Sequence, residues 1–234
     1  MISKKVGVIG GLGPKTGFEF GLHVNNKVMH KTQTQPEIIL TNVPMSPSLI
    51  AKIARGFPNK KHLNILKNAM HVVNKAKPDF IVIPCNTVHV FIKELRKVSK
   101  VPILSIVEET ARFCRKKKLK CVGILGSQTT IDNKLHTNEL MQRGIHTIIP
   151  CSEDQKKINE IIIRINKGNI VGNDKQIMRG IIQDLMGRGA ENIILACTDL
   201  YQVVSIHHFS NQIINTTTVL EDATVASMIK GGIK

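Results

Sequence analysis

Short runs of aliphatic residues alternate with longer stretches of helical spacing along most of the chain. The runs predict strands at residues 6–9, 37–43, 80–83, 103–106, 122–125, 147–149, 193–195 and 212–214. Most of them are nearly continuously apolar, which is typical of parallel strands buried on both faces. Helical spacing is clearest at residues 60–75, 108–117, 133–143 and 175–187. The alternation predicts an α/β fold in which helices flank mainly parallel sheets.

Two sequence patterns occur twice at nearly the same offset. Residues 5–10, KVGVIG, are similar to residues 121–126, CVGILG. Residues 78–87, PDFIVIPCNT, are similar to residues 190–199, AENIILACTD, and each segment carries one cysteine. The repeat predicts two pseudo-symmetric α/β lobes. We expect the first lobe to comprise residues 1–98 and 206–234 and the second to comprise residues 99–205.

The composition is that of a folded chain with an aliphatic core. The 234 residues are 42% apolar and 21% charged, values near the average for globular proteins, which excludes disordered and collagen-like chains. Aromatic residues make up only 3%. The formal net charge of +16 permits nucleic acid, membrane surfaces or acidic small molecules as partners, and it does not choose between them.

Several functions lack the sequence features that they need. No stretch approaches the roughly 18 apolar residues of a membrane span, and the N-terminal residues are too rich in glycine for a signal peptide. The five cysteines follow no zinc or disulfide spacing, so we expect no metal and a reduced, cytoplasmic protein. Residues 10–16, GGLGPKT, do not have phosphate-loop spacing. The basic clusters are dispersed and stacking aromatics are nearly absent, so we expect no nucleic-acid partner.

The two repeated cysteines are the main candidates for chemistry. Cys85 and Cys197 each follow a predicted buried strand and precede a helical pattern, where free backbone N–H groups would lower a thiol pKa from about 8.5. Asn86, Thr87 and Thr198 add donors that suit a carboxylate. One thiolate could remove a proton from carbon while the opposite thiol returns one to the other face. The alternative is that both cysteines are small core residues.

Segments along nearly the whole chain resemble the aspartate/glutamate racemase family, in particular its cofactor-independent aspartate and broad-specificity amino-acid racemase branch. The matching segments are GVIGGLGP at residues 7–14, NVP at 42–44, PCNTVH at 84–89, GILG at 123–126 and GAENIILACTDL at 189–200. The resemblance implies two α/β lobes with a cleft between them, no pyridoxal phosphate, an amino-acid substrate and a homodimer. It also implies that Cys85 and Cys197 form the acid/base pair.

The predicted substrate-binding residues lie in the repeated turns and in the segments of resemblance. They are Leu12, Gly13, Ser48, Asn86, Thr87, Ser127, Lys167 and Thr198. The resemblance implies that Asn86, Thr87 and Thr198 hold the substrate α-carboxylate.

Some positions depart from the family pattern. Ser48 stands where aspartate-specific members carry an arginine for the side-chain carboxylate, and its loss would weaken recognition of acidic side chains. Lys167 fits a lysine that the family carries about thirty residues before the second cysteine, or it is a cation that stabilises the end of a helix. Asp199 replaces a family glutamate. His89 follows Cys85 by one helical turn and either orients that thiol or is a buried histidine with a backbone partner.

The sequence therefore predicts a cofactor-independent amino-acid racemase, of aspartate/glutamate type or of broad specificity. Two alternatives stay open. One is a catalytically degenerate protein that binds an amino acid or a dicarboxylate. The other, less favoured, is an isomerase or decarboxylase of the same superfamily that uses a single cysteine. Retention of both cysteines favours the racemase.

Overall fold

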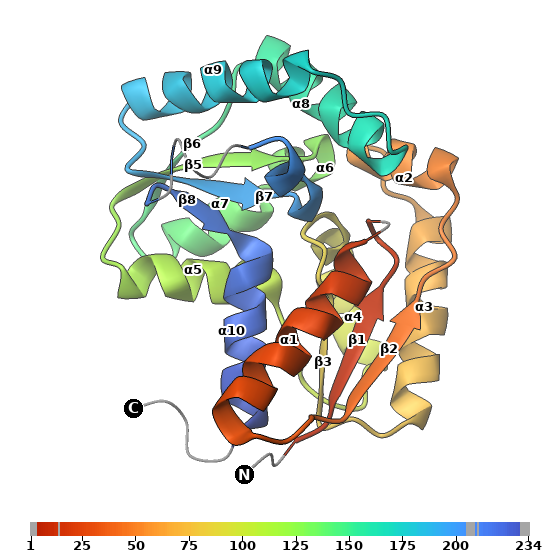
Figure 1. The fold of residues 1–234 in the computed structure, drawn as a ribbon. Coiled ribbons are helices and arrows are strands. Elements are labelled where there is room, and N and C mark those ends of the chain that lie inside the picture. The colour runs from red at the N-terminus through yellow and green to blue at the C-terminus, as the bar shows by residue number, and fades with distance from the viewer. Residues whose placement is uncertain (1–3, 14, 205–208, 210, 230–234) are drawn as a thin grey trace.

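The computed structural model describes residues 4–13, 15–204, 209 and 211–229 (Figure 1). Within this part of the chain the strands form two four-stranded sheets. The first sheet has the order β2-β1-β3-β4, with β1 at Val6–Gly10, β2 at Ile38–Asn42, β3 at Phe80–Val82 and β4 at Ile103–Leu104. The second has the order β6-β5-β7-β8, with β5 at Cys121–Gly126, β6 at His146–Ile148, β7 at Asn192–Ala196 and β8 at Ile213–Asn215.

Every strand pairing is parallel, and helices form the connections between the strands. The helices are α1 (Thr16–Thr32), α2 (Pro47–Ala54), α3 (Lys60–Lys75), η1 (Thr87–Phe91), α4 (Ile92–Val98), α5 (Ile106–Lys116), α6 (Gln128–Asp132), α7 (Leu135–Met141), α8 (Ser152–Asn166), α9 (Asn173–Gly187), η2 (Thr198–Gln202) and α10 (Thr216–Met228). The eight predicted strands and the α/β class are confirmed, because near-continuous apolar runs mark buried parallel strands.

The two sheets have the same topology, as the sequence repeat predicts. β1 and β5 occupy equivalent places, and so do β3 and β7, which carry the two cysteine motifs at their ends. In the first sheet β3 pairs with β1 on one side and with β4 on the other. In the second sheet β7 pairs in the same way with β5 and β8. The carboxyl ends of equivalent strands therefore carry equivalent turns.

The strand pairing departs from the expected lobe boundaries at two places. β4 lies within the predicted second lobe but pairs with β3 of the first sheet, and β8 lies in the predicted returning segment but pairs with β7 of the second. Each of these strands covers the edge of β3 or β7 in its own half, which would otherwise expose unpaired backbone groups. The segment that follows β8 does return: Leu220, Val225 and Met228 of α10 pack into the cluster under the first sheet. Residues 205–208 and 210, where this segment begins, lie outside the described residues.

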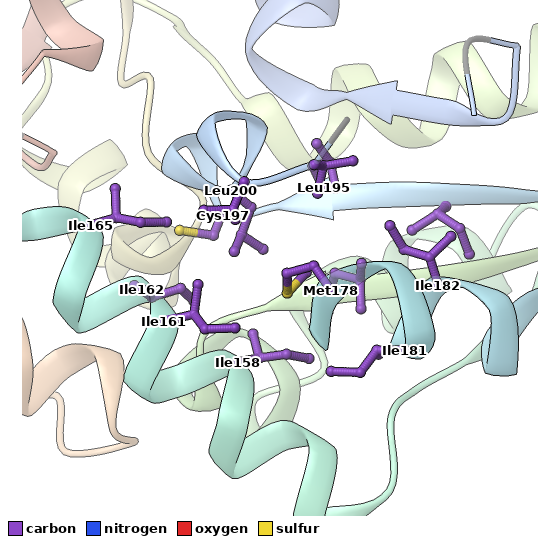
Figure 2. Close-up of a cluster of buried hydrophobic side chains, with 14 of the residues drawn as sticks. Ile158, Ile161, Ile162, Ile165, Met178, Ile181, Ile182, Leu195, Cys197 and Leu200 are labelled. Atoms are coloured by element: carbon purple, nitrogen blue, oxygen red, sulfur yellow. The ribbon is translucent and has the colours of Figure 1, made fainter. Parts of the chain in front are cut away.

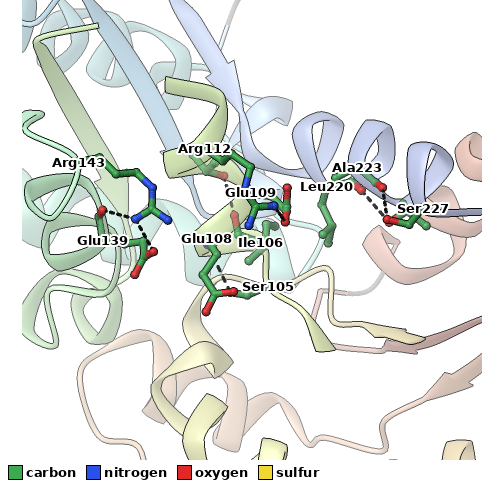
Figure 3. Close-up of polar contacts among 12 residues, drawn as sticks. Ser105, Ile106, Glu108, Glu109, Arg112, Glu139, Arg143, Leu220, Ala223 and Ser227 are labelled. Carbon is green, nitrogen blue, oxygen red and sulfur yellow. Dashed lines mark hydrogen bonds and ion pairs between the residues drawn. The ribbon is translucent and has the colours of Figure 1, made fainter. Parts of the chain in front are cut away.

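The core is aliphatic, as the composition predicts. Isoleucines of α8 and α9 pack against β5 and β7, and Figure 2 shows Cys197 at the end of this cluster, beside Leu200. Between the lobes, α5 lies against α7 and α10. Polar contacts reinforce this region: the Arg143 side chain contacts Glu139 on α7, and Ser105 caps the start of α5 (Figure 3).

No helix of the described residues is long and apolar enough to cross a membrane.

Candidate active site

A cavity lies between the lobes at the carboxyl ends of the four central strands. Leu12 follows β1, Cys85 follows β3, Ser127 follows β5 and Cys197 follows β7. The cavity is lined by Leu12, Met45, Ile50, Ile53, Ala54, Cys85, Asn86, Thr87, Val88, Ser127, Ile162, Asn166, Cys197, Thr198 and Asp199. In open α/β sheets this is where ligands bind. Both repeated cysteines thus face one shared space.

The two thiols have matching surroundings. A short 3₁₀ helix begins two residues after Cys85 and one residue after Cys197, and each cysteine side chain is 7% exposed. The backbone N–H groups two and three residues further on donate to each sulfur, from Thr87 and Val88 to Cys85 and from Asp199 and Leu200 to Cys197. The sequence repeat is therefore also a repeat of the thiol environment.

Both thiols are held in their neutral form. Burial raises the pKa of Cys85 to about 11, and burial followed by the nearby Asp199 carboxylate raises the pKa of Cys197 well above its ordinary value. Charge on Cys85 raises the pKa of Cys197 further, as expected for two thiols around one cavity. The prediction that free N–H groups would give a net lowering of the thiol pKa was wrong. Those groups do lower it, but burial has the larger effect because it removes water from the charged form.

Asp199 is a cavity residue that the predicted site did not include. Its side chain is buried, and it accepts hydrogen bonds from Thr16 Oγ1 at 3.1 Å and from Asn166 Nδ2 at 3.2 Å. Burial raises the pKa of this carboxyl group. Gly13 lies against it, since a Cβ at that position would be 2.7 Å from Asp199 Oδ1. The sequence signal for Asp199 was its place directly after Cys197 and Thr198, where the family pattern has an acid.

Hydroxyl groups from both lobes meet in the cavity. Thr87 Oγ1 lies 2.9 Å from Ser127 Oγ, which links η1 to the turn before α6. On the other side, Thr16 Oγ1 donates to Thr198 Oγ1 at 3.5 Å. These predicted residues supply hydrogen-bond donors on both sides of the space between the thiols.

Asn86 lines the cavity, but its side-chain amide has partners elsewhere. Asn86 Nδ2 donates to Thr216 Oγ1 at 3.0 Å, and Asn86 Oδ1 lies 2.8 Å from His136 Nε2. Thr216 in turn donates to the carbonyl of Leu195 in β7. The Asn86 side chain therefore ties η1 to α7 and α10.

Three predicted substrate-binding residues, Gly13, Ser48 and Lys167, do not line the cavity. Gly13 lies against the lining residue Asp199. Ser48 is exposed near the start of α2, where its hydroxyl lies 3.0 Å from Ser46 Oγ. Lys167 is exposed at the end of α8, so its position fits a cation that stabilises a helix terminus, while its neighbour Asn166 reaches the cavity. Neither the position expected for arginine nor the expected lysine thus supplies a positive charge to this cavity.

His89 contacts the backbone of Cys85 and not its thiol. His89 Nδ1 lies 2.8 Å from the Cys85 carbonyl oxygen, and burial lowers the pKa of this histidine to about 4. The interpretation of His89 as a buried histidine with a backbone partner is confirmed.

Among the residues that the structure describes, no group of three or more His, Cys, Asp or Glu side chains could hold a metal ion.

The sequence pattern of Asp/Glu/hydantoin racemases matches residues 9–224. The chain is 30% identical to the broad-specificity amino-acid racemase RacX of Bacillus subtilis over 157 residues, which cover 67% of this chain and 68% of that protein. Among solved structures, the Picrophilus torridus aspartate racemase superposes with a TM-score of 0.75 at 23% identity and covers 97% of this chain and 94% of its own. An aspartate racemase homologue from Pyrococcus horikoshii gives 0.73 at 22% identity, with coverages of 95% and 98%.

Proposed function

Because the chain belongs to the Asp/Glu/hydantoin racemase family, we propose that it racemises amino acids with Cys85 and Cys197 as its acid and base. The observation that carries this proposal is the pair of equivalent thiols lining one cavity between the lobes. A single general base would exchange a proton on one face of Cα only. Inversion needs a second proton donor on the opposite face, and the pseudo-symmetry of the two lobes supplies one.

The proposed step is balanced in protons and electrons. The thiolate of one cysteine takes the Cα proton, and the electron pair from the broken C–H bond moves onto Cα and the α-carboxylate. The thiol of the other cysteine then protonates Cα from the opposite face and becomes the thiolate. The enzyme ends with its thiol and thiolate exchanged, so the reverse reaction starts from this form. No external oxidant, reductant or leaving group is involved.

The polar lining would hold the two charges of the amino acid. The hydroxyls of Thr87, Ser127 and Thr198 can donate to the α-carboxylate, where negative charge grows as the Cα proton leaves. The Asp199 carboxylate can pair with the α-ammonium group. That pairing would offset the negative charge that raises both thiol pKa values, so substrate binding would itself favour the thiolate.

Substrate entry would require movement of the residues that close the cavity. The free space between the lobes is about 30 Å³, which suits a water-sized group and not a whole amino acid. On one side the cavity is closed by α2 and α8, which lie next to each other in Figure 1. Arg55, which directly follows α2, and Glu160 of α8 join them through an exposed ion pair at 3.0 Å, a contact of the kind that costs little to break.

The test is exchange of the Cα proton in deuterium oxide without added cofactor, together with the appearance of the opposite enantiomer. Cys85→Ala and Cys197→Ala should each lower racemisation by at least about 100-fold, the usual contribution of a general acid or base. Cys151→Ala is the matched control, because Cys151 is exposed and does not line the cavity. Racemisation that survives either active-site substitution would overturn the two-thiol mechanism.

A chain that binds amino acids without exchanging the Cα proton would be the degenerate binding protein. Exchange without inversion would instead indicate a one-cysteine enzyme. The homodimer, the cytoplasmic location and the absence of a cofactor stay predictions.

A further inference from the structure

The titratable side chains that line the cavity are all acids, and this bears on the substrate class of the proposed racemase. Cys85, Cys197 and Asp199 are its titratable lining residues, and among the residues that the structure describes no Lys, Arg or His lines it. Basic residues next to lining residues in the sequence do not line it themselves: Arg55 is paired with Glu160 outside, and Lys52 and Lys167 are exposed. The chain is strongly basic overall, yet the described part of it places no positive side chain in this cavity.

The part of the wall formed by α2, the residue before it and Ile162 of α8 is apolar and comes from both lobes. Met45 precedes α2, Ile50, Ile53 and Ala54 lie on it, and Ile162 of α8 faces them from the second lobe. Ile53 and Ala54 belong to the buried clusters of the first and second lobes respectively, so the wall continues both cores. A side chain that extends from Cα towards α2 and α8 therefore meets methyl and methylene groups.

The two charged groups that all amino acids share would bind to the polar residues of the cavity lining. The α-ammonium group has Asp199 and the α-carboxylate has the hydroxyls of Thr87, Ser127 and Thr198. A second carboxylate, on an aspartate or glutamate side chain, would be left among aliphatic groups without a positive partner. Burial of an unpaired charge is strongly unfavourable, whereas burial of an aliphatic side chain is favourable.

Resting on the proposed function, we infer that the substrates are amino acids with an uncharged aliphatic side chain and that acidic amino acids are poor substrates. Ile50 determines this preference, because it is a partly buried residue of the apolar wall on the short helix α2.

Three amino acids of nearly equal size provide the test in the wild-type protein. Leucine, asparagine and aspartate carry similarly branched side chains that are apolar, polar and charged. We expect kcat/KM for Cα exchange in deuterium oxide to fall in that order, with leucine favoured over aspartate by at least about 100-fold. Lysine is the fourth substrate tested, and its exchange should also be slower than that of leucine.

A charge introduced on α2 should shift the preference towards aspartate. Ile50→Arg places a guanidinium group, which pairs with carboxylates in a bidentate manner, on the apolar wall. We expect aspartate exchange to rise at least 10-fold and leucine exchange to fall. Ile50→Met is the matched control of similar volume without charge, and it should keep the wild-type order.

The outcomes separate this inference from the function on which it rests. If no amino acid exchanges its Cα proton, the proposed racemase activity itself fails. If exchange occurs and aspartate matches or exceeds leucine, the racemase stands and the aliphatic preference is overturned. Faster exchange of lysine than of leucine would also overturn it, because Asp199 would then serve the side chain. The wild-type comparison decides the question even if Ile50→Arg does not fold.

Discussion

Each candidate catalytic thiol is subject to opposing influences. Burial raises the pKa of Cys85 to about 11, while the N–H groups of Val88 and Thr87 lower it. Cys197 has the same kind of balance, with Asp199 acting on it more strongly. A thiol with a high pKa is rarely ionised at neutral pH, but its thiolate is a strong base once formed. The charge state of Asp199 is therefore a control on the reactivity of both sulfurs.

Replacement of Asp199 by asparagine should change catalysis in two ways. The alkaline rise of kcat/KM should move to lower pH, because removal of a nearby negative charge lowers the pKa of both thiols. The KM for the amino acid should rise by about 10-fold or more, because its α-ammonium group loses a charged partner. The measurement is the pH profile of kcat/KM alongside KM at a fixed pH.

The control for this prediction is Asp222→Asn, which removes an exposed carboxylate of α10 that pairs with Lys27 outside the cavity. It should leave the profile in place. An Asp199→Asn profile that coincides with that of the wild type would show that the carboxylate does not act on the thiols.

At the scale of elements, the repeated unit is a buried strand, a cysteine and a short 3₁₀ helix. β3 leads through Cys85 into η1, and β7 leads through Cys197 into η2. Because both strands are the second central strand of a parallel sheet, their ends lie at corresponding places in the two lobes. Strand register therefore sets the positions of the sulfurs more directly than any local contact of the cysteines.

The first strand also depends on a close approach to the helix that follows it. A Cβ on Gly17 of α1 would lie 2.7 Å from the Cα of Gly10 at the end of β1, a backbone atom that cannot turn aside as a side chain could. This contact brings α1 against the sheet just beyond the turn that carries Leu12 and Gly13. A side chain at either glycine would force these two elements apart.

Gly17→Ala should accordingly lower the free energy of unfolding by about 1–3 kcal/mol, the usual effect of overpacking. Gly180→Ala on α9 is the matched control, because its Cβ would meet nothing within 4 Å and the residue is exposed. Alanine is the better helix former, so this control should raise the free energy of unfolding by up to about 1 kcal/mol. Urea denaturation of the two variants measures both effects, and equal changes in the same direction would contradict the packing argument.

At the scale of the whole molecule, two buried histidines near the cavity restrict the pH range of stability, and one of them, His136, connects the lobes. His136 of α7 contacts Asn86 of the cavity wall, and His89 contacts the backbone of Cys85. Burial lowers the pKa of His136 to about 3 and that of His89 to about 4, and charge on His89 lowers the pKa of His136 further. Both side chains are therefore neutral in the folded protein at neutral pH.

The protein should lose stability as the pH falls below about 6.5. An unfolded histidine takes up a proton near that pH, whereas these two cannot do so in the folded state until about pH 4 and about pH 3. The unfolded state thus binds more protons in this range, and acid favours it. His136→Gln keeps an amide donor for Asn86 and should show a smaller drop in the free energy of unfolding between pH 7.5 and pH 4.5.

Urea denaturation at the two pH values measures this difference. The exposed His71→Gln serves as the control and should retain the wild-type dependence on pH. If His136→Gln and the wild type lose the same stability on acidification, the buried histidine is not the cause.

The positions of the strands along the chain, the two-lobed repeat and the placement of Cys85 and Cys197 after equivalent strands were determined by the sequence alone. They depend on local hydrophobic periodicity and on residues that directly follow strands. The sequence alone did not determine that β4 pairs with β3 and β8 with β7. This pairing depends on which edge is left open once the other strands have assembled.

Tertiary structure alone decided the charge of the cavity. Ser48 and Lys167 fit a motif by spacing, yet they point to other surfaces, while Asp199 lines the cavity. The direction of the thiol pKa shifts was decided in the same way: the backbone donors follow from the local turn, but burial is the sum of contacts from both lobes. Solvent exclusion is a property of the assembled fold, and no short stretch of sequence specifies it.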